Sequence, residues 1–179
     1  MHILQNELLS NHTTLRVGGV AETFVVVETQ AELLDVLTTY KDTEILILGS
    51  GSNLVIADTN FHGVVIQIQT QGIDVETDAC SGAMVRVQAG VNWDEFVSHA
   101  ISNEWSGVEA LSFIPGRVGA TPIQNVGAYG QDVSQSIARV KTFDRVEEKV
   151  KTFSVSECDF GYRTSIFKQT PHRYVILEV

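Results

Sequence analysis

The segment at residues 115–130, PGRVGATPIQNVGAYG, constrains the fold of this chain more than any other stretch. Its sixteen residues include four glycines, two alanines and two prolines. Glycine allows positive φ angles and close approach of the backbone to another surface, and proline stiffens the segment. Thr121, Gln124 and Asn125 add polar side chains. This mixture predicts a loop that places its backbone amides against a flat or anionic ligand. The alternative is a long turn between two packed elements.

A second segment, residues 44–58, also predicts a ligand-binding loop. Two short apolar runs, Ile45–Leu48 and Leu54–Ala57, flank the polar loop Gly49–Asn53 and predict strand, loop and strand. The loop sequence GSGSN offers amides, two serine hydroxyls and an asparagine to a pyrophosphate. It matches neither the phosphate-binding loop ending in Gly-Lys-Ser/Thr nor the Gly-x-Gly-x-x-Gly dinucleotide motif. Taken alone, such a loop is more often an ordinary tight turn.

Composition places the chain among globular proteins and excludes several classes. Its 179 residues suffice for one domain or one and a half small ones, with 44% hydrophobic and 19% charged residues. We find no apolar run of ~18 residues that would predict a membrane span. The first ten residues lack the pattern of an export signal. These features favour a protein of the cytoplasm.

The charge distribution argues against nucleic acid as a partner. The formal net charge is −10, whereas nucleic-acid surfaces need clusters of basic residues. Residues 1–110 carry a net charge of −12 and residues 111–179 a net charge of +2. An anionic ligand is therefore expected to favour the second part. The alternative is chance clustering of charges on a solvated surface.

Cysteine and histidine do not predict a metal site or a disulfide framework. Cys80 and Cys158 lie far apart and lack Cys-x-x-Cys spacing, which fits a reducing compartment. Neither has an adjacent base that would activate it as a nucleophile. The histidines do not occur in pairs at ligand spacing, so we predict no metal. They are His2, His12, His62, His99 and His172.

The hydrophobic periodicity predicts an α+β chain without regular βαβ alternation. Two capping-box patterns predict helices over about 29–41 and 92–103. The second helix is expected to bury Phe96, Val97 and Ile101. The predicted strands are Phe24–Glu28, Ile45–Leu48, Leu54–Ala57, Gly63–Gln69, Ile73–Thr77, Ala83–Gln88, Ala138–Asp144 and Lys149–Phe153.

Taken together, the motifs resemble the MurB family, the UDP-N-acetylenolpyruvoylglucosamine reductases. In that family's order, the chain carries TTLRVGG at 13–19, GSGSN at 49–53, the glycine-rich segment at 115–130, and CDFGYRTSIFK at 158–168. The resemblance implies an α+β FAD-binding fold of the vanillyl-alcohol-oxidase type. It further implies a FAD-binding domain over 1–130 and the start of a small α+β substrate domain over 131–179.

The resemblance also implies a reaction. Non-covalent FAD, reduced by NADPH, reduces the enolpyruvyl group of UDP-N-acetylglucosamine enolpyruvate to UDP-N-acetylmuramate for peptidoglycan synthesis. The family is bacterial and cytoplasmic, and the full-length form is expected to be monomeric. Because the family continues past residue 179 with a serine proton donor and a late glutamate, we expect this chain to be inactive alone. Two alternatives remain: another FAD-dependent oxidase or dehydrogenase of this fold, and a non-catalytic flavin-binding module.

The resemblance assigns the following site residues. Arg163 is expected to stabilise the negative charge that develops on the substrate carboxylate, although a lone arginine is more often part of a surface salt bridge. Tyr162 is expected to bind the sugar nucleotide together with Arg163. The expected cofactor-binding residues are Gly49, Ser50, Gly51, Ser52, Asn53, Leu54, Ile114, Pro115, Gly116, Gly119, Ala120, Thr121, Gln124, Asn125, Gly127, Ala128, Tyr129 and Ile176.

Overall fold

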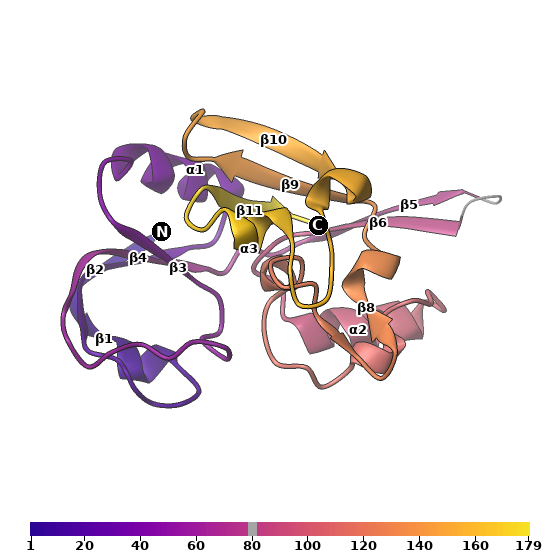
Figure 1. Cartoon of the computed structure of the whole chain (residues 1–179), viewed down its shortest axis with the longest axis horizontal. Coiled ribbons are helices and arrows are strands. Elements are labelled where there is room, and N and C mark those ends of the chain that lie inside the picture. Colours follow the sequence, from indigo (N-terminus) through magenta and orange to yellow (C-terminus); the bar gives the residue numbers. More distant parts are fainter. Residues whose placement is uncertain (79–81) are drawn as a thin grey trace. The chain divides into compact units, whose positions relative to one another are not determined.

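The computed structural model describes residues 1–78 and 82–179, so Cys80 lies outside the described residues. The chain divides into two units, Met1–Thr70 and Gln71–Val179 (Figure 1). The second unit contains both the glycine-rich segment and the strands that follow it. This division differs from the domain boundary expected after residue 130, which stays a prediction.

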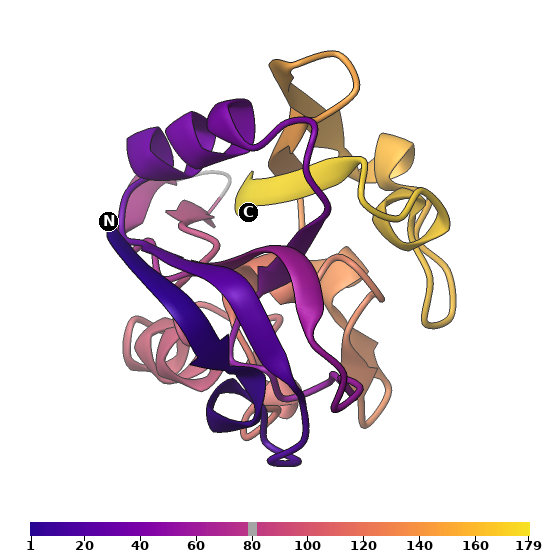
Figure 2. The ribbon, with the colours of Figure 1, turned by 90° about the vertical axis from the view of Figure 1, so that its left-hand side faces the viewer.

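The first unit is a four-stranded sheet with one helix. Its strands run in the order β1-β2-β4-β3, with β1 antiparallel to β2, and both β2 and β3 parallel to β4. Figure 2 shows these strands side by side. The elements are β1 (His2–Leu8), η1 (Leu9–His12), β2 (Val20–Val27), α1 (Gln30–Thr39), β3 (Ile45–Leu48) and β4 (Phe61–Ile68).

The core of the first unit follows from the central position of β4. Val64, Val65 and Ile66 point alternately to the two faces of the sheet, and all three are buried. Helix α1 begins as predicted: Thr29 and Glu32 form the capping box, with each side chain bonded to the other residue's backbone.

The second apolar run of the 44–58 segment is not a strand, so that prediction is wrong for Leu54–Ala57. The run is held instead by single contacts. The amide of Gly19 donates to the Ala57 carbonyl at 2.9 Å, and Leu54 and Ile56 pack against the core. Leu54 and Ile56 therefore serve packing without forming a ladder, whereas Val55 is 80% exposed.

The second unit contains an antiparallel sheet and a hairpin. The sheet has the order β10-β9-β11, and β5 pairs with β6. Its elements are β5 (Ile73–Asp78), β6 (Gly82–Val87), α2 (Trp93–Ser102), η2 (Glu109–Leu111), η3 (Val118–Ala120), β7 (Gly127–Ala128), β8 (Gln131–Asp132), η4 (Val133–Gln135), β9 (Arg139–Asp144), β10 (Lys149–Ser154), η5 (Val155–Cys158), α3 (Ile166–Gln169) and β11 (Tyr174–Glu178).

Backbone hydrogen bonds join the hairpin to the sheet. Val87 and Val179 exchange two bonds at 2.8 and 3.0 Å, and the Ala89 amide donates to the Leu177 carbonyl at 3.0 Å. With β9 on its other side, β11 is paired along both edges, and Ile176 in its middle is 5% exposed.

Helix α2 begins after Asn92, whose side chain caps it as the sequence predicts. Its buried residues are Trp93, Val97 and Ala100, a spacing that places them on one face. Ile101 is 52% exposed, so its predicted burial is wrong. Ile101 follows Ala100 directly, and the turn of the helix from one residue to the next places the Ile101 side chain outside the apolar face.

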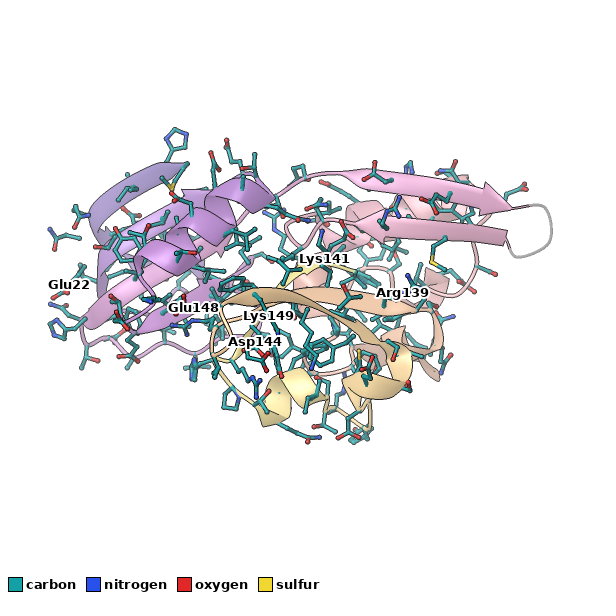
Figure 3. The ribbon with its side chains drawn as sticks, turned by 90° about the horizontal axis from the view of Figure 1, so that it is seen from above. Glu22, Arg139, Lys141, Asp144, Glu148 and Lys149 are labelled. Carbon is teal, nitrogen blue, oxygen red and sulfur yellow. The ribbon has the colours of Figure 1, made fainter. Side chains whose placement is uncertain are left out.

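The predicted hairpin of the two strands β9 and β10 is confirmed, and Asp144 fixes its turn (Figure 3). The Asp144 carboxylate accepts the amides of Val146 and Glu147 and pairs with the Arg173 guanidinium at 2.8 Å. Burial tends to raise the pKa of Asp144, but Arg173 and the two amides outweigh that effect and lower the pKa below its ordinary value.

Asp144→Asn is expected to lower the melting temperature of the chain at pH 7 by roughly 5 °C. Because the folded pKa is lowered, the stabilisation is present above the unfolded pKa of about 3.9 and is lost as pH falls through the folded value. The difference between wild type and variant should therefore narrow on acidification. Calorimetry from pH 7 to pH 3 measures it, and a constant difference would contradict the assignment.

Candidate functional site

The middle of the glycine-rich segment is fixed by its own amides. The Val118 amide donates to the Val91 carbonyl and the Gly119 amide to the Ala89 carbonyl, both at 2.9 Å. The amides of Ala120 and Thr121 close the short helix η3 at 3.0 Å each. These four amides are thus engaged within the protein and differ from the ligand donors that the sequence suggested.

Packing against Ala89 explains why residue 119 is glycine. A Cβ atom at Gly119 would come within 2.6 Å of the Ala89 side chain and 3.0 Å of its Cα atom. Glycine at this position thus allows η3 to pack closely against the chain that follows β6, within the second unit.

Gly119→Val should therefore destabilise the second unit whether or not a ligand is present. Overpacking of this kind costs about 1–3 kcal/mol, or a melting temperature lower by roughly 2–10 °C. Ala120→Val is the matched control, because Ala120 is exposed. Thermal unfolding of both variants measures the effect. Equal stabilities of the two variants would contradict the packing argument.

Several residues around the segment adopt a left-handed backbone. Asn125 has φ 47°, Tyr129 has φ 52° and Phe113 has φ 61°. Arg163, distant in sequence, has φ 55°. Such conformations are uncommon for residues other than glycine and cluster at functional sites.

A tight turn carries Tyr162 and Arg163. Gly161 and Thr164 exchange backbone hydrogen bonds at 3.1 and 3.3 Å, so the two residues between them form the tip. The Lys168 ammonium donates to the Arg163 carbonyl at 2.9 Å. We call residues 161–164 the arginine turn.

Three side-chain hydrogen bonds tie this part of the chain to the glycine-rich segment. The Arg163 guanidinium donates to the Gly127 carbonyl at 2.8 Å, and the Asn125 amide donates to the Gly161 carbonyl at 3.2 Å. The buried Ser165 hydroxyl donates to the Ile123 carbonyl at 2.6 Å. The structure thus brings together two motifs that the sequence analysis treated separately.

Large aromatic side chains are exposed at these loops. Tyr162 is 94% exposed, Tyr129 is 91% exposed and Phe113 is 89% exposed. The two tyrosines were expected site residues, whereas Phe113, whose amide donates to the Asp94 carboxylate at 2.6 Å, was not. Its position directly before Ile114-Pro115, at the entrance of the glycine-rich segment, was the available signal.

Other expected cofactor residues of the second unit have internal contacts. Thr121 is 4% exposed, and its hydroxyl donates to the Val118 carbonyl at 2.9 Å. Ile114 and Ala128 are partly buried against the core, and the Gly116 carbonyl accepts from the Trp93 amide. Their assignment to a cofactor stays a prediction.

In the first unit, the GSGSN loop packs on the TTLRVGG motif. Gly51 has φ 64°, and a Cβ atom there would lie 2.0 Å from the His12 carbonyl oxygen. The Thr14 amide donates to the Gly51 carbonyl at 3.1 Å. Within the described residues, the buried Ser50 hydroxyl has no hydrogen-bond partner. An oxygen-rich ligand such as a pyrophosphate fits this unused donor, because buried polar groups are normally paired.

The remaining chemistry of the described residues is sparse. Burial first, and Glu157 second, raise the pKa of the Cys158 thiol to about 11, so it stays protonated at neutral pH. Over residues 1–78 and 82–179, no group of three histidine, cysteine or acidic side chains is placed to hold a metal ion. Among those residues, no helix has the length and apolar character needed to cross a membrane.

Comparison with known proteins gives consistent matches. The model of the FAD binding domain family matches residues 21–152. The UDP-N-acetylenolpyruvoylglucosamine reductase of Cutibacterium acnes is 51% identical over 172 residues, covering 93% of this chain and 45% of that relative. The Thermobifida fusca enzyme is 47% identical over 180 residues, covering 98% and 49%. The chain therefore spans about half the length of the curated relatives it matches.

Solved structures that resemble this chain are consistent with the matches to the curated relatives. The crystal structure of MurB from Thermus caldophilus matches with a TM-score of 0.79 and 28% identity, covering 99% of this chain and 60% of that one. The VAO-type flavoprotein MtVAO713 from Myceliophthora thermophila matches with a TM-score of 0.66 at 15% identity, which shows the fold alone. The expected family resemblance and the expected α+β fold are confirmed.

Proposed function

We propose that this chain, which belongs to the FAD binding domain family, is the FAD-binding part of a UDP-N-acetylenolpyruvoylglucosamine reductase. The reaction is the NADPH-dependent reduction of the enolpyruvyl group of a UDP-sugar to UDP-N-acetylmuramate in the bacterial cytoplasm. The proposal is supported by the curated relatives. The single observation that carries it is the contact of Arg163 with the glycine-rich segment at Gly127.

FAD, when bound, supplies the hydride chemistry that links NADPH to the enolpyruvyl group. The loop Gly49–Leu54 of the first unit is assigned to the pyrophosphate, with the Ser50 hydroxyl as an unused donor. In the second unit, the residues assigned to the flavin are Gln124, Asn125, Gly127, Ala128 and Tyr129, and Ile114–Gly116 and Gly119–Thr121 are also assigned to FAD.

Arg163 is assigned to the substrate carboxylate. Its guanidinium now donates to a neutral carbonyl oxygen, and a charged carboxylate is a stronger acceptor that two N–H groups can hold at once. Addition to the enolpyruvyl double bond spreads negative charge onto that carboxylate, where a fixed cation stabilises it. Tyr162, next to Arg163 and exposed, is assigned to the sugar nucleotide.

The alternative of another oxidase or dehydrogenase of this fold has support at the level of fold only. The sequence GYRTS at 161–165 favours the reductase, because it belongs to the MurB pattern. A non-catalytic module is separated from both by whether the chain binds FAD.

The test is FAD binding by the purified chain and by Ser50→Ala. We expect the wild type to bind FAD without a covalent bond, so denaturation releases it. Removing the Ser50 hydroxyl should weaken binding by about 10- to 100-fold, as a hydrogen bond to a charged group contributes roughly 1.5–3 kcal/mol. Titration followed by visible absorbance measures both.

Two controls accompany this test. Ser102→Ala, on the exposed face of α2, should not change FAD affinity. Since the Ser50 hydroxyl has no partner within the described residues, the FAD-free Ser50→Ala chain should be as stable as wild type. A wild-type chain that binds no FAD would refute the proposed function.

A further inference from the structure

The Asn125 side chain connects three segments of the second unit. Its amide nitrogen donates to the Gly161 carbonyl of the arginine turn at 3.2 Å. Its amide oxygen accepts from the Ser134 amide in η4 at 3.1 Å. Asn125 is 6% exposed, so this bridge is shielded from water.

The arginine turn depends on polar contacts for its position. Tyr162 at its tip is almost fully exposed and does not anchor it. The bonds from Asn125 to Gly161 and from Arg163 to Gly127 hold the turn, and Ser165 fixes the chain at its base. The bonds of Asn125 and of the buried Ser165 are both independent of the arginine that is to bind substrate, and of the two only the Asn125 bond reaches the turn itself.

We propose that Asn125 is a positioning residue that holds the arginine turn against the glycine-rich segment and couples the turn to cofactor occupancy. The coupling of the arginine turn to cofactor occupancy rests on the proposed function. Both polar atoms of the Asn125 side chain are engaged within the protein, and the direct cofactor contact expected from sequence stays a prediction. Arg163 would then be oriented only when the segment beside it is ordered.

The left-handed backbone of Asn125 decides which substitutions are informative. Glycine adopts φ 47° without strain, so Asn125→Gly removes both hydrogen bonds and leaves the backbone free to keep its path. Asn125→Asp retains an oxygen for the Ser134 amide but replaces the donor to Gly161 with an acceptor. Asn6→Gly is the matched control, because Asn6 has φ 57° and is exposed in β1 of the first unit.

The measurement is hydrogen–deuterium exchange of the 179-residue chain, with and without saturating FAD. Without FAD, both Asn125 variants should exchange the amides of 161–164 about 3- to 10-fold faster than wild type. The Ser134 amide should remain protected in both variants, because the Asp132 carboxylate also accepts it at 3.1 Å. A general loss of stability would speed exchange both at 161–164 and at Ser134. Asn6→Gly should change the exchange rate at neither place.

Exchange measured in the presence of FAD tests the coupling separately from the proposed function. In the wild type, FAD should slow exchange at 161–164, and in Asn125→Asp that protection should be lost while FAD affinity changes less than about threefold. Unchanged exchange at 161–164 in Asn125→Gly or Asn125→Asp overturns the positioning role. Bound FAD that gives no protection in wild type overturns the coupling. Absence of FAD binding overturns the proposed function, and the experiments without FAD still decide the positioning role.

Discussion

Arg163→Ala is expected to slow reduction of the enolpyruvyl substrate by about 10²–10³-fold, because it removes the cation that faces the developing charge. FAD affinity should change little, since the guanidinium contacts a carbonyl oxygen at the edge of the segment. The assay uses a chimera in which the C-terminal half of the Cutibacterium acnes relative follows residue 179. NADPH consumption before substrate is added should be unaffected.

Two variants control this prediction. Arg163→Lys keeps a positive charge but lacks the planar fork, and we expect an intermediate rate. Arg139→Ala removes an exposed arginine of β9 and should leave the rate unchanged. If Arg163→Ala reacts as fast as wild type in the chimera, Arg163 has no part in the reaction.

The 179-residue chain loaded with FAD is expected to form product at least ~10²–10⁴-fold more slowly than the chimera. The reaction requires a proton donor beside the substrate. The Ser165 hydroxyl, close to Arg163 in sequence, is fully buried and donates to the Ile123 carbonyl. The Cys158 thiol is also buried.

Steady-state product formation by the chain and by the chimera at equal FAD occupancy tests this expectation. Weaker positioning of the substrate would lower the rate of product formation further, beyond the effect on proton transfer. Rates ordinary for enzymes, about 1–10³ per second, from the 179-residue chain would show that residues 1–179 suffice and that our assignment of roles is wrong.

The expected site was only partly accessible to sequence reasoning. The motif GYRTS made Arg163 a candidate, which stays a prediction, and nothing in its spacing predicted a bond to the Gly127 carbonyl, 36 residues away. Gly119 was expected among the cofactor-binding residues, which stays a prediction, and the structure adds a packing reason for it, because a Cβ atom there would lie 2.6 Å from the Ala89 side chain. The left-handed backbone and the exposure of Phe113 emerge only from the fold.

The sequence by itself determined the features whose hydrogen bonds close within a few residues. The capping box of Thr29 and Glu32, the Asn92 cap and the bonds from the Asp144 carboxylate to the Val146 and Glu147 amides are of this kind, because each joins close neighbours in the sequence. The hydrophobic periodicity likewise sufficed for the α+β fold, and the order of the motifs sufficed for the family.

Only the tertiary structure decided the contacts between distant segments. The Ser165 hydroxyl bonds to a carbonyl 42 residues earlier, and the Asn125 amide to one 36 residues later. The same holds for Leu54 and Ile56, which pack on the core without pairing in a strand. Such contacts require the backbones of a whole unit to be in place, so their geometry depends on packing that no local pattern specifies.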